Sequence, residues 1–329
     1  MNILITGATG FIGSRLALRH LQGGASVRIL AQENNAAESE HRRLLEARGA
    51  EVAIASVTDR DRVLAAVRGI DVVYHLAAAQ HEANIPDRRF WDVNVRGTEY
   101  LLEASVAAGV SRFVHGSTIG VYGSALDGRL DEQSPVQPDN IYGVTKFAAE
   151  TRVLAFREQL PVVIIRIAET YGPGDRRLLK LFKAIQRKVC FVIGSGNNLH
   201  HPVYIDDLVE GLCLAATVKD AVGQVFVLPG KEPLTTAAML ETIARQLSTR
   251  IPAFHLPMAM FLAAAIVLEN TCRPLGIQPP LHRRRLDFFR KNFVFSQERS
   301  ATLLGFTPRI GFEQGVAETA EWYKARGDL

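Results

Sequence analysis

A strand, a glycine-rich turn and an amphipathic helix follow one another at the start of the chain, and this feature constrains the fold most. The apolar run Ile3-Leu-Ile5 leads into Thr6-Gly-Ala-Thr-Gly-Phe-Ile-Gly13, and a helix with Leu16 on its apolar side follows. The first glycine of the turn permits a sharp bend, the second lets backbone amides approach a pyrophosphate, and the third lets the helix pack closely on the strand. The turn therefore predicts a dinucleotide-binding α/β fold.

Strands and helices alternate along the next part of the chain. Further strands are expected at 25–31, 51–54, 70–75, 112–115 and 162–166, with helices between them at positions such as 59–68 and 91–109. Parallel strands in one sheet are joined by right-handed crossovers through helices. This order therefore predicts a Rossmann-type doubly wound parallel sheet.

After the sixth strand the chain is expected to leave the sheet and return to it once. The returning part comprises 203–207, a helix at 208–217 and a strand at 224–228. We therefore predict a Rossmann domain at 1–168, completed by 203–228, and a smaller, mostly helical substrate-binding domain at 169–202 and 229–329.

The longest apolar run, Met258 to Leu268, is too short to span a bilayer, which takes ~20 residues. We expect a helix here that is buried or covers the substrate, and contact with a membrane surface is left open.

Composition argues against several classes of function. A net charge of +4 without a long run of like charges favours small anionic ligands over nucleic acid. Cys190, Cys213 and Cys272 lie far apart among apolar neighbours, so we expect buried free thiols and no metal site. The N-terminus lacks the features of a signal peptide, and a cytoplasmic protein is expected.

Tyr142 and Lys146 lie four residues apart in a segment with helical spacing, 139–150. On a helix this separation places both side chains on one face. A phenol with a pKa near ~10 is a poor acid or base at neutral pH, but a nearby ammonium stabilises the phenolate. The pair is thus a candidate proton relay, and Thr118, at the end of the fifth strand, is expected to lie close to it.

The second strand ends at Ala31-Gln32-Glu33 and lacks the acid that would bind the adenosine ribose of NAD at the expected place. A 2′-phosphate is therefore tolerated, with Arg15, Arg42 and Arg43 as candidate counter-charges. The cofactor is expected to be NAD or NADP, with a weak preference for NADP.

Seven motifs occur in a characteristic order, at 6–13, 75–78, 94–98, 117–123, 142–146, 171–174 and 203–207. Together they resemble the extended short-chain dehydrogenase/reductase superfamily, in its NAD-dependent epimerase/dehydratase branch, over nearly the whole length. The resemblance implies that Tyr142 is the acid/base, that Lys146 lowers its pKa and holds the nicotinamide ribose, and that Thr118 hydrogen-bonds the reacting oxygen.

The resemblance also implies two sets of binding residues and a homodimer formed through the helices that contain Asn94 and Tyr142. Expected to bind the cofactor are Gly7, Thr9, Gly10, Phe11, Ile12, Gly13, Gln32, Leu76, Ala77, Ala78, Asn94, Ser117, Tyr142, Lys146 and Ile167. Expected to bind the substrate are Gln80, Thr118, Glu169, Arg177, His200 and Arg285.

The residues after Thr118 narrow the reaction that the resemblance implies. Sugar-nucleotide 4,6-dehydratases of this family have Asp-Glu there, whereas this chain has Ile119 and Gly120, which transfer no proton. The expected reaction is hydride transfer at one carbinol or keto carbon of a nucleotide sugar, of the 4-keto reductase or 4-epimerase type. Net oxidation or reduction and epimerisation both stay open.

Two alternatives remain. Segments 279–283, 295–296 and 304–308 resemble 3β-hydroxysteroid dehydrogenases, which favours an oxidoreductase acting on a hydrophobic alcohol. A non-catalytic NAD(P)-binding sensor or scaffold is the alternative from another class. The presence of both Tyr142 and Lys146 argues against it.

Overall fold

The computed structural model describes residues 1–80, 85–124, 128–272, 279, 281 and 286–329. Arg285, which the sequence predicts to bind substrate, lies outside the described residues, as do its neighbours Arg283 and Arg284.

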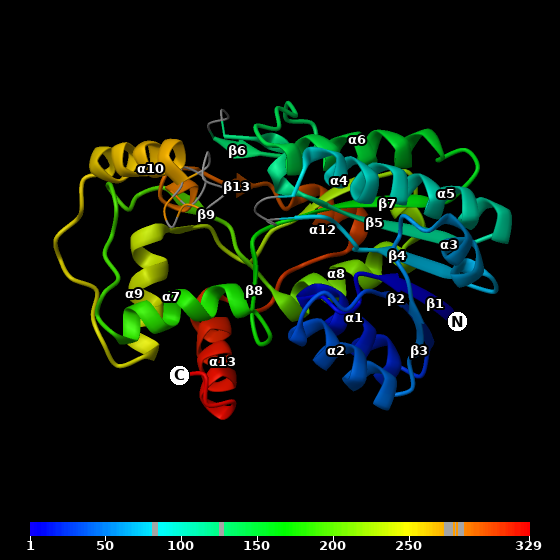
Figure 1. Ribbon diagram of the computed structural model, residues 1–329, viewed down its shortest axis with the longest axis horizontal. Helices are drawn as coiled ribbons and strands as arrows, with labels where there is room; N and C mark the ends of the chain where they lie inside the picture. The colour runs from blue at the N-terminus through cyan, green and yellow to red at the C-terminus, as the bar shows by residue number, and fades with distance from the viewer. Residues whose placement is uncertain (81–84, 125–127, 273–278, 280, 282–285) are drawn as a thin grey trace.

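Within the described residues, seven strands form one parallel sheet in the order β11-β7-β5-β4-β1-β2-β3 (Figure 1). The strands are β1 (Asn2–Thr6), β2 (Ser26–Ala31), β3 (Glu51–Ile54), β4 (Val72–His75), β5 (Arg112–Thr118), β7 (Val162–Ile167) and β11 (Val225–Leu228). The chain runs outward from β1 to β3 and then crosses back to β4 on the other side of β1. The predicted doubly wound Rossmann-type sheet is confirmed, and ligands bind such sheets at the carboxyl ends of the strands where the order reverses.

Helices cover both faces of the sheet because its strands are apolar on both sides. Ile3 and Ile5 belong to one buried core and Leu4, between them, to another, as expected for side chains that alternate along a strand. On the first face lie α1 (Phe11–Gln22), α2 (Ala36–Ala47) and α8 (Ile205–Thr217). On the second lie α3 (Arg60–Val67), α5 (Gly97–Ala108) and α6 (Ile141–Ala155), and Figure 1 shows the sheet between the two layers.

The other helices and strands lie outside the main sheet and its two helical layers, and several of them lie beyond the carboxyl ends of the strands. They are α7 (Arg176–Gln186), α9 (Thr236–Gln246), α10 (Met258–Cys272), α12 (Glu298–Leu304), α13 (Phe312–Ala325), β6 (Arg129–Leu130), β8 (Thr170–Tyr171), β9 (Leu199–His200), β10 (Val203–Tyr204), β12 (Leu234–Thr235) and β13 (Val294–Phe295). Short helices complete them: α4 (Asp87–Trp91), η1 (Asp92–Arg96), η2 (Ile119–Tyr122), η3 (Lys219–Ala221) and η5 (Asp287–Phe289). Phe182 of α7 packs edge-on against Tyr323 of α13. The division into two domains stays a prediction.

The predicted return to the sheet at 203–207 is wrong. β10 pairs with β8 in a separate two-stranded parallel sheet, and β11 alone rejoins the main sheet. β10 is only two residues long because α8 begins directly after it, at Ile205. The segment that leaves the main sheet after β7 contains β8, which pairs with β10.

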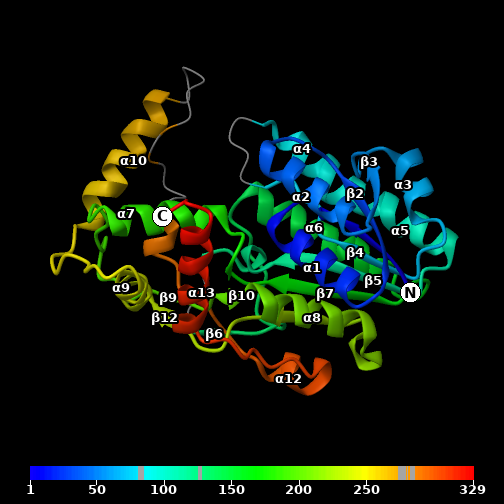
Figure 2. The same ribbon diagram turned by 90° about the horizontal axis from the view of Figure 1, so that it is seen from below.

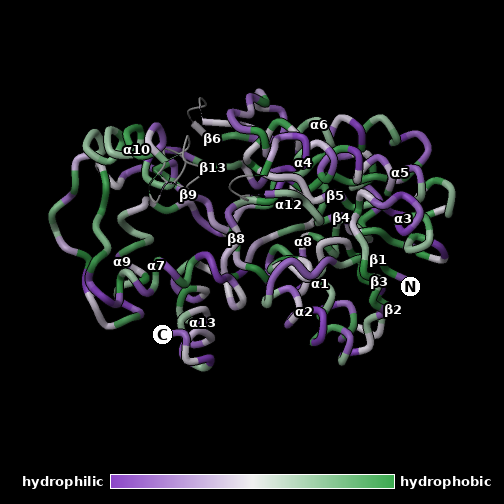
Figure 3. The backbone as a smooth tube through the Cα atoms, viewed as in Figure 1, coloured by the Kyte–Doolittle hydropathy of each residue, from purple (hydrophilic) through white to green (hydrophobic). Residues whose placement is uncertain are grey.

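The apolar segment at 258–268 is expected to be buried or to cover the substrate; burial is wrong, and the covering of the substrate stays a prediction. It forms α10, a helix whose residues are all described and in which Ala265 and Glu269 are the buried ones. Met260 is 66% exposed and Val267 is 60% exposed. Figure 2 shows α10 at the edge of the molecule, and Figure 3 shows that it is hydrophobic along most of its length. Its apolar residues surround the helix, so one face at most packs against the protein.

Two further findings concern the cysteines and the membrane. All three cysteines are free; Cys190 is buried as expected, whereas Cys213 and Cys272 are only partly buried. Among the described residues, no helix is both long enough and apolar enough to cross a membrane.

Candidate active site

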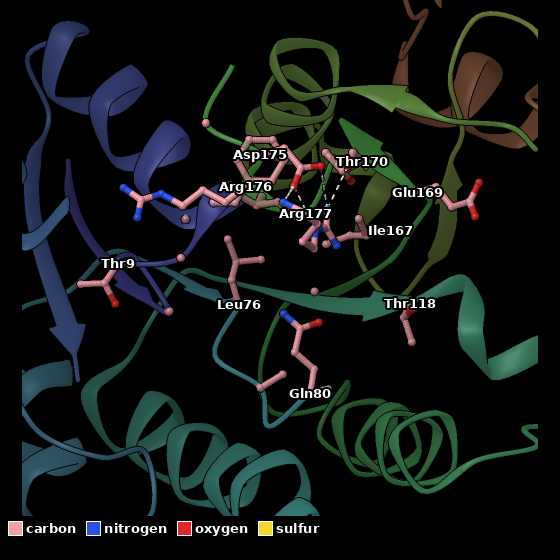
Figure 4. Close-up of a pocket in the computed structure, with 18 of the residues that line it drawn as sticks. Thr9, Leu76, Gln80, Thr118, Ile167, Glu169, Thr170, Asp175, Arg176 and Arg177 are labelled. Carbon is pink, nitrogen blue, oxygen red and sulfur yellow. Dashed lines mark hydrogen bonds and ion pairs between the residues drawn. The ribbon is translucent and has the colours of Figure 1, made fainter. Parts of the chain in front are cut away.

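A cavity of about 460 Å³ opens at the carboxyl ends of the strands. Figure 4 shows Thr9 at one end of it and Thr118 and Glu169 at the other. The residues that the sequence predicts for the site and that line the cavity are Gly7, Thr9, Gly10, Phe11, Ile12, Gly13, Leu76, Ala78, Gln80, Ser117, Thr118, Tyr142, Ile167, Glu169 and Arg177. Five others, Gln32, Ala77, Asn94, Lys146 and His200, lie outside that lining. The roles of all these residues stay predictions.

The glycine turn forms the floor of the cavity at the Thr9 end. Gly7 has a φ of +71°, and a Cβ there would lie 2.7 Å from the backbone nitrogen of Ala77. A Cβ on Gly13 would lie 2.2 Å from the carbonyl oxygen of Gly7. α1 starts after Gly10 with no side-chain cap and no acid in its first turn. Its first amides are therefore suited to a pyrophosphate, so this part of the site fits a dinucleotide.

A buried chain of hydrogen bonds supports the turn from behind. The Thr98 hydroxyl donates to the carbonyl of Asn94 at 2.7 Å, so the Nε2–H of His75, 2.8 Å away, donates to Thr98. The Nδ1 of His75 then accepts from the Thr6 hydroxyl at 2.8 Å. Burial, followed by the charge of Lys146, lowers the pKa of His75 to about 3, which keeps this imidazole neutral.

Asn94 acts on the backbone beside the cavity. Its Oδ1 accepts from the amide of Ala79 at 2.8 Å, and its Nδ2 donates to the Thr145 hydroxyl at 3.0 Å. The side chain thus connects the loop after β4 to α6. Although the sequence predicts Asn94 to bind cofactor, these contacts indicate that it shapes the loop that lines the cavity.

α6 carries the tyrosine and the lysine. The Oδ1 of Asn140 accepts from the amide of Gly143 at 3.1 Å and caps the helix, so Tyr142 lies in its first turn and reaches the cavity. Lys146, one turn further, is buried and donates from Nζ to Nε2 of His115 at 3.3 Å. Burial lowers the pKa of Lys146 to about 8, and the charge of Glu150 partly opposes the effect.

A buried ion pair fixes α6 to the sheet. Arg166 of β7 donates from Nη2 to Oε2 of Glu150 at 2.8 Å, and both side chains are almost fully buried. The Ser117 hydroxyl donates to Oε1 of the same carboxylate at 2.5 Å. Ser117 is thus occupied in holding α6, next to the cavity that it lines.

Thr118 ends β5 and faces the cavity. Its Oγ1 accepts from the amide of Gly120 at 3.1 Å, and this bond leaves the hydroxyl hydrogen for an oxygen of a ligand. Ile119, the residue that follows, is buried in the core.

At the Thr118 end of the cavity, Glu169 forms an ion pair with His200. The Nδ1 of His200 lies 2.8 Å from Oε2 of Glu169, and the histidine is buried while the carboxylate is 37% exposed. The Thr236 hydroxyl donates to Oδ1 of Asn198 at 2.7 Å, so the Nε2–H of His200 donates to Thr236 at 3.0 Å.

The carboxylate of Glu169 favours the charged form of His200. Burial opposes the imidazolium, but Glu169 outweighs it and raises the pKa of His200 above its usual value. When His200 is protonated it offsets the charge of Glu169, whose second oxygen is left for the cavity.

Sequence reasoning missed the residues from the start of α2 that line the cavity near Thr9, namely Asn35, Ala37, Glu38 and His41. Asn35 caps α2 by accepting from the amides of Ala37 and Glu38, both at 3.1 Å. An asparagine followed three residues later by a glutamate is a recognisable helix start. This pattern is the sequence signal that could have identified the start of α2. Gly116, Ile119, Ala168, Thr170, Gly174 and Asp175 also line the cavity and were missed as well.

The comparison with family models decides the family. Residues 3–228 match the model of the NAD dependent epimerase/dehydratase family. The chain belongs to this family. The members of this family are NAD-dependent enzymes of the extended short-chain dehydrogenase/reductase type, so the predicted enzyme class is confirmed.

Two proteins with named activities are similar to this chain. The chain is 30% identical to a dTDP-glucose 4,6-dehydratase of Streptomyces niveus, over 98% of this chain and 93% of that protein. It is 26% identical to 3beta-hydroxysteroid-dehydrogenase/decarboxylase isoform 2 of Arabidopsis thaliana, over 81% of this chain and 51% of that protein.

Among solved structures, MoeE5 in complex with UDP-glucuronic acid and NAD superposes on this chain with a TM-score of 0.78. It is 26% identical, and the match covers 99% of this chain and 100% of that one.

Proposed function

We propose that the protein catalyses NAD-dependent hydride transfer at one carbinol or keto carbon of a nucleotide sugar, as a 4-keto reductase or a 4-epimerase. One observation carries the proposal: the glycine turn, Thr118 and Tyr142 line the same cavity. The sugar-nucleotide relatives support the substrate class.

Each residue of the site has a role in this reaction. Bound NAD supplies or accepts the hydride. The Tyr142 hydroxyl takes the proton of the carbinol or returns it, while the buried ammonium of Lys146 stabilises the phenolate. The Thr118 hydroxyl donates to the reacting oxygen and holds it beside Tyr142.

The Glu169–His200 pair favours a sugar nucleotide over a steroid. A carboxylate accepts hydrogen bonds and donates none, so it suits a ligand that is rich in hydroxyl groups. Because protonated His200 offsets its charge, Glu169 repels an anionic diphosphate less than an unpaired carboxylate would. A sugar nucleotide combines both properties.

For the cofactor we favour NAD, although the sequence predicts a weak preference for NADP. Glu38 lines the cavity near Thr9, where a carboxylate suits the ribose hydroxyls of NAD and repels a 2′-phosphate. Two of the three arginines proposed for the phosphate have acidic partners: Arg15 pairs with Asp206, and Arg42 pairs with Glu33 and Glu46. Arg43 donates to the carbonyl of Ser39 at 3.3 Å. Glu38→Gln is expected to narrow the difference in affinity between NAD and NADP, as measured by calorimetric titration.

A hydrophobic alcohol remains the second candidate substrate. The exposed apolar helix α10 and the similarity to the hydroxysteroid enzyme favour it. If the substrate is a hydrophobic alcohol, the protein is expected to turn over a 3β-hydroxysteroid. If the substrate is a nucleotide sugar, it is expected not to turn over the steroid.

One experiment separates these outcomes. The protein is incubated with NAD and, in turn, with UDP-glucose, UDP-glucuronic acid, dTDP-glucose and a 3β-hydroxysteroid, while nicotinamide absorbance is followed and products are identified by mass. A reductase or dehydrogenase changes the absorbance in proportion to product, whereas an epimerase forms product without net change. A product lighter by one water would contradict the proposal, because Ile119 and Gly120 provide no second acid. A cytoplasmic location stays a prediction.

A further inference from the structure

An exposed apolar surface lies at the edge of the molecule, around α10. We define it by five exposed side chains, Val189, Phe254, Met260, Ile266 and Val267. Met260 is 66% exposed, Val189 is 62% exposed, Val267 is 60% exposed and Phe254 is 59% exposed. Figure 3 shows the hydrophobic helix, and Figure 2 shows that it stands out from the helices beside it.

Two segments far apart in the sequence form this surface together. The amide of Gly194 donates to the carbonyl of Leu256 at 2.9 Å, and the amide of Leu256 donates to the carbonyl of Val192 at 2.9 Å. The rings of Phe191 and Phe254 are 5.1 Å apart. These contacts fix the end of the α7 segment beside the start of α10. Met260 and Val267, seven residues apart, share one face of that helix and extend the surface along it.

Positive charge borders the apolar surface. Arg187 and Lys188 are exposed and directly precede Val189. From Arg176 to Lys188 the chain contains basic residues and no acidic one. From Ile251 to Leu268 it contains no Asp, Glu, Lys or Arg. The apolar surface is thus uncharged, and its border is basic.

We propose that this surface docks onto the surface of an anionic lipid bilayer, with α10 lying in the interface. A helix that is hydrophobic on all sides and projects from the protein fits an apolar medium better than a partner's groove. The basic border matches anionic headgroups. A second copy of the chain would instead bring two basic borders together.

The docking surface and the cavity lie at opposite ends of α7. Arg176 and Arg177, at the start of this helix, line the cavity, whereas Arg187 and Lys188 follow its end. Membrane binding is therefore separable from cofactor binding, and the proposal does not depend on which substrate the enzyme uses.

Sedimentation with vesicles tests the proposal on the full chain. We expect the protein to bind vesicles of phosphatidylcholine mixed with phosphatidylglycerol, to bind phosphatidylcholine alone more weakly, and to lose the difference at high salt. Met260→Glu with Val267→Glu is expected to lower the partition coefficient ~10-fold or more, because two apolar side chains no longer enter the interface. Arg187→Glu with Lys188→Glu is expected to weaken binding to the anionic vesicles alone.

Ile54→Glu serves as the matched control, because Ile54 is 57% exposed but lies on β3, at the far edge of the sheet. It should bind vesicles as the wild type does. Cofactor affinity, measured in parallel, reports that each variant is folded. Wild-type protein that stays in solution with both vesicle types overturns the proposal. So does a Met260→Glu, Val267→Glu variant that binds vesicles normally or that only changes the oligomeric state.

Discussion

Lys146 is unusual because a lysine side chain is rarely buried without an acidic partner in contact. Its Nζ donates to a neutral imidazole, His115, which satisfies a hydrogen bond without cancelling the charge. A buried cation that no carboxylate contacts strongly favours a nearby anion. The phenolate of Tyr142, one turn away on the same helix face, is the anion that this arrangement suits.

Tyr142→Phe is therefore expected to lower turnover by ~10²–10⁴-fold, the range of a lost proton transfer, while cofactor affinity and fold change little. Tyr100→Phe, on α5 and only partly buried, is the control and should retain normal turnover. The test is a rate measurement on the substrate that the experiment under Proposed function identifies. A Tyr142→Phe enzyme with normal turnover would refute the mechanism.

Two fully buried histidines, His75 and His115, predict how stability depends on pH. Burial, followed by the charge of Lys146, lowers both pKa values, to about 3 for His75, against ~6.5 in the unfolded chain. Below pH ~6.5 the unfolded state therefore binds protons that the folded state excludes, and the free energy of unfolding falls as the pH falls. Each histidine contributes about 1.4 kcal/mol per pH unit once the pH is well below 6.5.

His200 acts in the opposite sense, because its pKa is raised and its contribution is lost at higher pH. Urea unfolding at pH 7.5, 6.5 and 5.5 checks the balance, and we expect the lowest stability at pH 5.5. Equal stability at all three values would contradict the prediction that His75 and His115 dominate the pH dependence.

At the scale of elements, α6 depends on the ion pair between Glu150 and Arg166. Glu150→Gln leaves the charge of Arg166 buried and unpaired, which costs about 3–5 kcal/mol. Arg152→Gln is the matched control on the same helix, because Arg152 is 59% exposed and its partner Glu99 is 34% exposed, so that this pair contributes about 0–1 kcal/mol. Denaturant unfolding compares the two. A loss for Glu150→Gln no larger than for Arg152→Gln would show that the pair does not anchor α6.

The elements that the sequence predicts well are those fixed by local physics. Gly7 and Gly13 are required by close backbone contacts, and the spacing of Tyr142 and Lys146 is set by the helix period. By contrast, β10 was assigned to the wrong sheet because an apolar pair of residues carries no information about its partner strand. Glu38 was missed because it enters the cavity from α2, which follows the strand end where an acid was sought.

The error at α10 has a different cause. Hydrophobicity along 258–268 predicts that these side chains avoid water, but it does not say whether protein, substrate or lipid covers them. The structure places Met260 and Val267 outside the core. The sequence therefore identified an apolar helix correctly and could not specify its environment.

At the scale of the whole molecule, a second apolar surface supports the predicted homodimer. Trp91 is 43% exposed, Val144 is 36% exposed and Phe147 is 37% exposed, on the neighbouring helices α4 and α6. Trp91→Glu with Phe147→Glu is expected to convert a dimer into a monomer in sedimentation velocity, because a buried charge disrupts an apolar interface. Met260→Glu, on α10, should leave the dimer intact. A wild-type monomer at micromolar concentration would exclude the dimer.

The position of β11 at the edge of the sheet matters while the protein is being made. β7 ends at Ile167, but the strand that covers its outer edge begins only at Val225. The residues from Val162 to Ile165 are completely buried in the finished protein. At a synthesis rate of about 5–20 residues per second, the ribosome takes roughly 3–12 s to reach β11 after β7. Throughout that interval the nascent chain carries an unpaired, apolar strand edge, which is the kind of segment that aggregates and that chaperones bind.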